Sequence, residues 1–325
     1  MTATDAATAD RSRLAHFPIT FFATSMGMMG LALALRAGEA TFGFGHAGST
    51  AVLALSGLLF GLVVLGYGLK ALRHPHEVVA EWRHPMRIAF FPAMSISLLL
   101  FATALLDLAP AAAHGLWVAG AALQGALALA VISAWIGHRP FQPGMMTPAW
   151  FIPAVGNVIV PLAGARLGHV DISWLFFSSG LVFWVVLLTL VMNRLMFHDP
   201  LPGRMLPTLM ILVAPPAVAF VAWLRRAGEP GPFGHILLRT AYVFALLVAT
   251  QAGRFRQLPF ALSWWALSFP LAALAIASFG YAHAAASAAH RMIGAGLLLL
   301  LAAVVAVLIL RTAAAIRDGT ICVPE

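Results

Sequence analysis

Residues 51–69 read AVLALSGLLFGLVVLGYGL, an apolar run without a charged residue. Its length matches the roughly 20 residues that a helix needs to cross the hydrocarbon core of a bilayer. Similar runs recur along the whole chain and give ten predicted membrane spans. The spans are residues 17–35, 51–69, 88–106, 115–136, 150–167, 172–197, 205–224, 236–252, 260–283 and 292–310. Because lipid offers no hydrogen-bonding partners, each span must satisfy its own backbone, which predicts an all-α integral membrane protein rather than a barrel.

The composition excludes a soluble protein. Hydrophobic residues make up 62% of the chain and charged residues only 9%, where a soluble domain carries roughly a quarter charged residues. The net charge of +8 does not indicate a nucleic-acid partner, since the basic residues sit singly or in small clusters between apolar runs. The single cysteine, Cys322, excludes an intrachain disulfide.

We interpret residues 17–312 as one membrane domain between short cytoplasmic tails, residues 1–16 and 313–325. The first tail has no apolar core followed by a cleavage site, so no signal peptide is predicted. The longest hydrophilic connection, residues 70–87, is predicted to contain a short cytoplasmic helix.

The lysines and arginines predict the orientation. With a cytoplasmic N-terminus, 13 of the 19 fall on the cytoplasmic side, as cytoplasmic loops require. The other six are Arg36, Arg166, Arg225, Arg226, Arg239 and Arg291. We therefore expect a multi-pass protein of the inner (plasma) membrane with both termini in the cytoplasm.

Proline inside the spans is confined to the odd-numbered ones. It removes a backbone donor and kinks a helix, and kinked membrane helices usually face protein or a water-filled path. We therefore expect five helical hairpins around a central pore, with the odd-numbered helices inside. Prolines are also simply commoner in membrane helices, which is the alternative explanation. The predicted kink sites are Pro92, Pro153, Pro161, Pro207, Pro215, Pro216 and Pro270.

The spans contain almost no ionisable groups; only Asp107, ending the third, and Arg239, early in the eighth, come close. There is no phosphate loop, nucleophile elbow or His-Glu metal motif, so we expect no catalytic residue, cofactor or metal site. The odd-numbered spans instead offer small, hydroxyl and amide groups, which can donate hydrogen bonds to an anion without holding it too tightly. Small residues also serve close helix packing, so each position has two interpretations. The candidate pore-lining residues are Thr24, Ser25, Gly27, Ser95, Ser97, Gly156, Asn157, Thr208, Ser263 and Ser268.

Four stretches carry a family resemblance: RIAFFPAMSIS (87–97), PAWFIPAVGN (148–157), LPTLMILVAPP (206–216) and FALSWWALSFP (260–270). They resemble the tellurite-resistance/dicarboxylate transporter family, which includes plant slow-type anion channels and bacterial TehA-like homologues. The resemblance implies five hairpins around a pore and transport of anions ranging from chloride and nitrate to malate, sulfite and tellurite. It also implies a phenylalanine from the ninth span that plugs the pore, which by motif position is Phe269. Bacterial members carry a proline in the middle of the first span, where this chain has Ser25.

The resemblance further implies a homotrimer with one pore per subunit. Four small residues of the second span are candidates for close contacts between subunits: Gly57, Gly61, Gly66 and Gly68. The expected partners are small inorganic or organic anions and the lipid bilayer.

The leading hypothesis is a passive or weakly coupled anion channel gated by Phe269. The alternative is a proton-coupled C4-dicarboxylate carrier, or a sulfite or tellurite exporter, on the same fold. Proton coupling usually needs buried carboxylates or histidines as relays. Asp107 is the one acidic candidate, and its place near a span end better suits a residue that flanks or caps a helix. A membrane-embedded enzyme would need a polar catalytic cluster, and the sequence offers none.

The charge bias and the even span count predict that a reporter fused after Glu325 stays in the cytoplasm. Paired fusions of a periplasm-active and a cytoplasm-active reporter measure this directly. Activity of the periplasmic reporter alone would overturn the predicted orientation.

Overall fold

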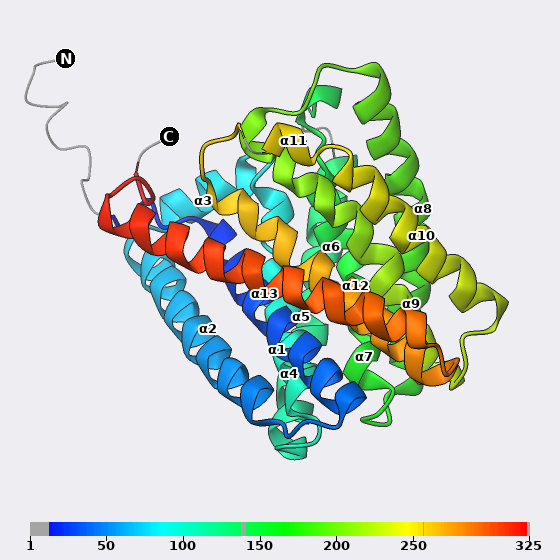
Figure 1. The fold of residues 1–325 in the computed structure, drawn as a ribbon. Helices are drawn as coiled ribbons and strands as arrows, with labels where there is room; N and C mark the ends of the chain where they lie inside the picture. The colour runs from blue at the N-terminus through cyan, green and yellow to red at the C-terminus, as the bar shows by residue number, and fades with distance from the viewer. Residues whose placement is uncertain (1–12, 138–140, 256, 324–325) are drawn as a thin grey trace, which may run out of the picture.

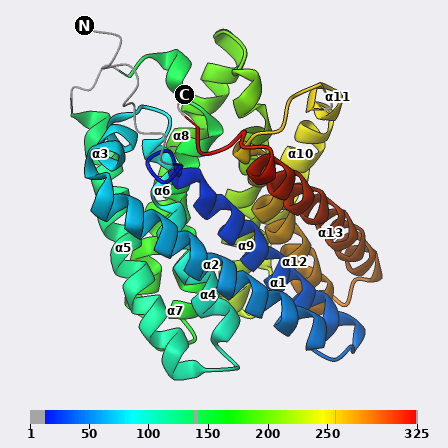
Figure 2. The same ribbon diagram turned by 90° about the vertical axis from the view of Figure 1, so that its left-hand side faces the viewer.

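The computed structural model describes residues 13–137, 141–255 and 257–323, and within them the regular elements are all helical. Among these described residues, nine helices are long and apolar enough to cross a membrane, which confirms the predicted all-α membrane architecture. Most of the predicted N-terminal tail, Arg139 and Arg256 lie outside the described residues. Figures 1 and 2 show one bundle in which the long α13 lies across α1 and α12.

Five long helices form the outside of the bundle. They are α2 (Ala47–Arg73), α5 (Pro110–Ile136), α8 (Val170–Phe197), α10 (Gly231–Ala249) and α13 (Ala288–Arg317). In their most apolar stretches only 22 to 33% of residues are buried within the chain. Their other faces are covered with exposed leucine, valine and isoleucine. Such faces suit contact with lipid.

The odd-numbered spans form a closed ring inside these helices. We call them the five central segments: η1–α1 (Ile19–Phe21, Phe22–Phe42), η2–α4 (Ile88–Phe90, Ala93–Leu105), η4–α7 (148–164), η6–α9 (Gly203–Val213, Ala214–Ala227) and η7–α12 (Leu262–Leu267, Ser268–Ala284). In the four continuous ones, 67 to 89% of residues are buried. Each central segment packs against the next around the ring, and against the outer helix that follows it in sequence. The prediction that the odd-numbered helices lie inside agrees with this burial.

The fifth predicted span differs from expectation. In place of one helix over 150–167, the structure has four short pieces: η4 (Pro148–Trp150), α6 (Phe151–Val155), η5 (Gly156–Ile159) and α7 (Pro161–Gly164). Pro148, Pro153 and Pro161 lack the N–H that a continuous helix needs, so the ladder of backbone hydrogen bonds is interrupted. This segment is too short to count among the nine membrane-length helices, and the tenth crossing stays a prediction.

Side chains from neighbouring elements satisfy the carbonyls of this broken segment. Gln124 on α5 donates to Pro153 O at 3.0 Å, and Trp117, also on α5, donates its indole N–H to Val160 O at 2.9 Å. Arg225 on α9 donates to Leu162 O at 2.6 Å. A buried carbonyl without a partner costs free energy comparable to a lost hydrogen bond. These donors therefore permit an irregular backbone at membrane depth.

All five central segments begin with a 3-10 helix. Such runs rarely exceed three or four residues, yet η6 extends over 11. All seven predicted kink prolines lie in, or at the boundaries of, these short pieces. Pro92 precedes α4, Pro207 lies inside η6 and Pro270 is the third residue of α12. Five of the seven, Pro92, Pro161, Pro215, Pro216 and Pro270, thus lie near a point where a 3-10 helix gives way to α-helix, whereas η1–α1 contains none of the seven.

A buried ion pair joins the N-terminal end of the ring to the connection after α2. Lys70 and Glu81 have side chains only 2% and 3% exposed, and Lys70 Nζ lies 2.9 Å from Glu81 Oε2. Glu81 also accepts from Tyr67 OH at 2.9 Å and from Ile19 N at 3.2 Å, while Lys70 donates to Phe17 O at 2.9 Å. The predicted cytoplasmic helix is α3 (Pro75–Arg83), and Glu81 ties it to the start of η1.

The two ends of the described chain lie on the same face of the bundle. A Cβ atom added to Gly319 would lie 3.0 Å from Nη2 of Arg13. An even number of crossings places both ends on one side of a membrane, so this proximity is consistent with ten spans.

We expect Glu81→Gln to lower thermal stability strongly, because it leaves Lys70 buried without a countercharge, and losing one partner of a buried pair costs about 3–5 kcal/mol. Thermal unfolding of the purified protein in mild detergent measures this. The matched control is Glu77→Gln on the same helix, where the carboxylate is partly exposed. Replacing both partners, Lys70→Met with Glu81→Leu, should recover part of the loss. Equal stability of the Glu81→Gln and Glu77→Gln variants would contradict the role of this pair.

Candidate functional site

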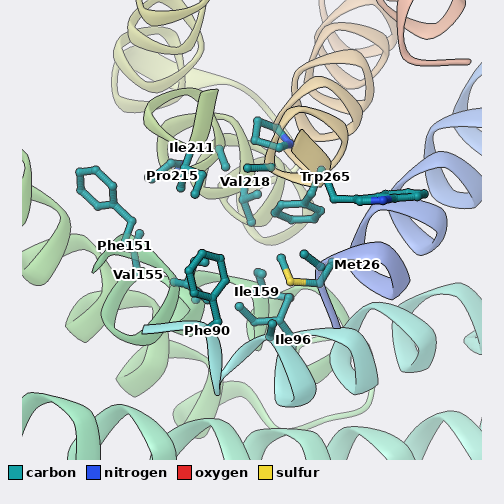
Figure 3. Close-up of a pocket in the computed structure, with 18 of the residues that line it drawn as sticks. Met26, Phe90, Ile96, Phe151, Val155, Ile159, Ile211, Pro215, Val218 and Trp265 are labelled. Carbon is teal, nitrogen blue, oxygen red and sulfur yellow. The ribbon is translucent and has the colours of Figure 1, made fainter. Parts of the chain in front are cut away.

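Two cavities lie inside the ring of central segments. The first, which we call the apolar cavity, has a volume of about 60 Å³. Every central segment contributes to it, with Met26, Phe90, Val155, Ile211 and Trp265 among the lining residues (Figure 3). Its polar side chains are only Ser263, whose hydroxyl donates to Arg204 O, and Trp265, whose indole N–H donates to Thr312 Oγ1 at 3.0 Å. The cavity therefore presents mainly carbon atoms.

The second cavity has a volume of about 230 Å³, and the same five central segments line it. We call it the arginine cavity, because Arg36, Arg166 and Arg225 line it together with Asp107. A water molecule needs roughly 10–15 Å³ of such space. The apolar cavity thus has room for a few water-sized particles, and the arginine cavity for several times as many.

The two cavities follow one another along the bundle. In α1 the apolar cavity is lined by Ala23 and Met26, and the arginine cavity by residues from Gly30 onward. The same order, earlier residues at the apolar cavity and later ones at the arginine cavity, holds in all five central segments. Only two residues line both, Val218 on α9 and Phe269 on α12. These two side chains stand where the cavities meet.

Phe269 owes its position to the start of α12. The segment changes from 3-10 to α-helix at Ser268, and Pro270 follows directly. The Ser268 hydroxyl donates to Trp265 O at 2.6 Å, which holds this junction. On the facing α1, a Cβ added to Gly30 would lie 3.5 Å from Cδ2 of Phe269. That distance is ordinary van der Waals contact, and the closer neighbour of the added Cβ would be Cβ of Ala272 at 3.0 Å, so α1 and α12 approach closely beside the Phe269 ring.

The ten candidate pore-lining residues are distributed unevenly. Gly156 and Ser263 line the apolar cavity, and the other eight line neither of the two cavities. Five of these eight donate their hydroxyl to a carbonyl three or four residues earlier: Thr24, Ser95, Ser97, Thr208 and Ser268. Gly27 packs tightly, since an added Cβ would lie 2.2 Å from Oγ of Ser268. Ser25 is buried, and its hydroxyl has no partner among the described residues. Pore lining by these eight stays a prediction.

Ser95 and Asn157 belong to a buried network centred on Gln124 of α5. Ser95 donates to Gln124 Oε1 at 2.7 Å, and Gln124 Nε2 donates to Asn157 Oδ1 at 3.1 Å. Asn157 in turn donates to Ser179 on α8 at 3.2 Å. The network joins two central segments to two outer helices, so these polar groups already have partners within the protein.

The arginine cavity was missed from the sequence, where Asp107 read mainly as a helix cap. Asp107 accepts a hydrogen bond from Arg166 Nη2 at 2.8 Å, and its other oxygen lies 3.6 Å from Arg36 Nη2. The hydrogen bond from Arg166 holds the pKa of Asp107 below its usual range, and the charges of Arg166, Arg36 and Arg225 act in the same direction. One signal for these three arginines was present in the sequence: all belong to the six basic residues predicted to lie on the non-cytoplasmic side of the membrane.

The chain matches the family described as SLAC1, voltage-dependent anion channel, over residues 16–313. The S-type anion channel SLAH3 of Arabidopsis thaliana is 31% identical over 222 residues, 66% of this chain and 34% of that protein. The guard cell S-type anion channel SLAC1 of the same plant is 24% identical over 312 residues, 92% of this chain and 56% of that protein. The tellurite resistance protein TehA homolog of Haemophilus influenzae is 25% identical over 269 residues, 82% of this chain and 81% of that protein.

This chain thus spans about a third of SLAH3 and just over half of guard cell SLAC1. The resemblance that the four sequence stretches carried is confirmed by these matches. Since the family match covers all five central segments and the outer helices around them, the chain belongs to the SLAC1 voltage-dependent anion channel family and is a multi-pass membrane protein.

Proposed function

We propose that this protein conducts small anions across the membrane through the apolar and arginine cavities, and that Phe269 closes the passage between them. The observation that carries the proposal is the position of Phe269, which lines both cavities with Val218 alone. The family match and the named activities of the plant relatives support anions as the permeating species.

A phenylalanine ring is an effective barrier to an anion. It fills the lumen, and it offers no group that replaces the hydration water an anion loses there. Moving a charge out of water without replacement partners costs many kcal/mol. Even ~3 kcal/mol of barrier slows passage by about a hundredfold. The bend expected around Pro270 supplies a hinge through which the ring can change position.

The cavity lining favours a channel over a proton-coupled carrier. No titratable carboxylate or histidine is among the residues that line the apolar cavity. Asp107, the acidic group of the arginine cavity, is paired with two arginines. Without a relay for protons at the narrow point, the driving force is the electrochemical gradient of the anion.

A dicarboxylate carrier or a sulfite or tellurite exporter is the second candidate. The similarity to the TehA homolog, which covers about four fifths of both chains, favours it. Proteoliposomes separate the two functions. A chloride or nitrate current that reverses at the Nernst potential supports a channel, whereas malate uptake that needs a pH gradient supports a carrier.

We propose further that the protein assembles as a homotrimer. Of the four glycines of α2 considered for subunit contacts, two pack within the chain: Gly57 against the ring of Phe101 and Gly66 against that of Phe17. Gly61 and Gly68 have open space around them. They lie two turns apart on one exposed face, which suits close packing with another helix.

Cross-linking in mild detergent should therefore give a trimer as the largest product. Gly61→Leu should reduce that product, whereas Gly115→Leu, at an equally open position on α5, serves as the matched control. Saturation at the dimer would exclude the trimer.

Replacing Phe269 by alanine should raise chloride and nitrate currents by about a hundredfold if the ring contributes a barrier of ~3 kcal/mol. The order of permeating anions should stay the same, because the residues that line the two cavities are otherwise unchanged. Current recordings at matched protein amounts measure both quantities.

The matched control is Phe220→Ala. Phe220 is fully buried on α9 and lines neither cavity. Loss of a buried phenylalanine costs about 3–5 kcal/mol of stability, so the Phe220 variant should express poorly without conducting more. A well-folded Phe269→Ala variant with wild-type current would remove Phe269 from the mechanism.

A further inference from the structure

The arginine cavity carries an excess of positive charge. Arg36, Arg166 and Arg225 line it, and Asp107 is the single acidic residue among its lining. In the part of the chain that the structure describes, Arg225 makes no ion pair. Three guanidinium groups facing one carboxylate leave two positive charges without a counterion in a partly enclosed space. Such a space concentrates anions.

The rule that governs charged loops does not account for these arginines. Basic residues favour the cytoplasmic side, and only six of the 19 fall on the other side. Three of those six line this one cavity: Arg36 on α1, Arg225 on α9 and Arg166 two residues after α7. The bias of loop charges does not require these arginines to meet, so their convergence indicates a function at the site.

Asp107 shows what kind of ligand these guanidinium groups accept. It uses one oxygen for Arg166 at 2.8 Å and directs the other toward Arg36 at 3.6 Å. A planar anion with two oxygens fits the donors of arginine better than a point charge does. The Asp107 carboxylate therefore contacts the guanidinium groups in the way that a small oxyanion would.

Arg225 completes the site from α9, which packs next to the broken segment in the ring. Its Nη1 donates to Leu162 O at 2.6 Å, which anchors the guanidinium to the broken segment. The remaining donors of the group are left for a ligand, because an arginine side chain carries five N–H bonds. The next residue, Arg226, lies instead over the ring of Trp174 at 5.7 Å and does not line the cavity.

We propose that Arg36, Arg166 and Arg225 form a binding site for a small oxyanion, and that Asp107 is its internal competitor. An arriving anion exchanges with the Asp107 carboxylate at Arg166. The competition keeps binding weak enough for the anion to leave toward Phe269 or back to solvent, as conduction requires. The role of the site in permeation rests on the proposed function, but its occupancy does not.

Nitrate binding is measured in an assay that does not depend on transport. The full chain is placed in nanodiscs of zwitterionic lipid, and its unfolding temperature is followed against nitrate concentration. Ionic strength is held constant with a sulfonate buffer anion too bulky for the cavity. A ligand that binds the folded state raises the unfolding temperature, and the dose dependence gives an apparent affinity for each variant. Because the dependence is read within each variant, a change in basal stability does not affect the comparison.

Asp107→Asn should lower the nitrate concentration for half-maximal effect by about threefold, the scale of one partly exposed charge pair. Arg225→Gln should raise it by about fivefold on the same scale. Arg226→Gln, which removes the same charge one residue away, should leave it unchanged. If Arg225→Gln fails to fold, Arg36→Gln replaces it, since the only ion pair of Arg36 among the described residues is the 3.6 Å contact with Asp107.

Shifts in the cavity variants no larger than that of Arg226→Gln would overturn the proposal and leave the cluster a purely structural one. Chloride that binds as tightly as nitrate would overturn the assignment to oxyanions. Parallel flux measurements keep the two proposals apart. Nitrate binding with no flux contradicts the proposed function and supports the site, whereas flux with unshifted binding contradicts the site and supports the function.

Discussion

The structure depends on one constraint, that a backbone polar group at membrane depth must find its partner within the protein. The central segments cannot satisfy it with their own helical hydrogen bonds alone, because proline interrupts them and 3-10 turns replace regular helix. They can satisfy it only inside a complete ring of outer helices. Gln124 and Trp117 show how closely the two layers depend on each other, since both reach from α5 to carbonyls of the broken segment.

The same irregularity shapes the space in the middle. The five kinked segments enclose two cavities that follow one another along the bundle. The cavities differ in chemistry: one is walled by carbon atoms and the other by arginines. An anion in the arginine cavity would keep partners for its charge and would lose them on reaching Phe269. In the proposed function, this contrast between the cavities would add to the barrier that the Phe269 ring forms.

Sequence reasoning identified the residue types at the site better than their roles. Phe269 was located by motif, and the structure places it where the cavities meet. Ser95 and Asn157 have the polar character expected of a pore, but Gln124 on an outer helix engages both. No sequence pattern predicts that Gln124 binds these two residues, because Gln124 is an isolated amide in an apolar run. The pairing of Lys70 with Glu81 was missed for a similar reason, since a lysine at a span end reads as a topogenic charge.

The sequence by itself determined the membrane environment, the approximate spans and the division into kinked and smooth segments. These follow from hydropathy and from the missing N–H of proline, which are local properties of the chain. Only the tertiary structure decided which side chains meet: the break of the fifth span into four pieces, the sharing of Phe269 and Val218 by two cavities, and the convergence of three arginines on Asp107. Such meetings depend on the rotation and register of each helix against its neighbours. Packing of the whole ring sets both, and no single segment encodes them.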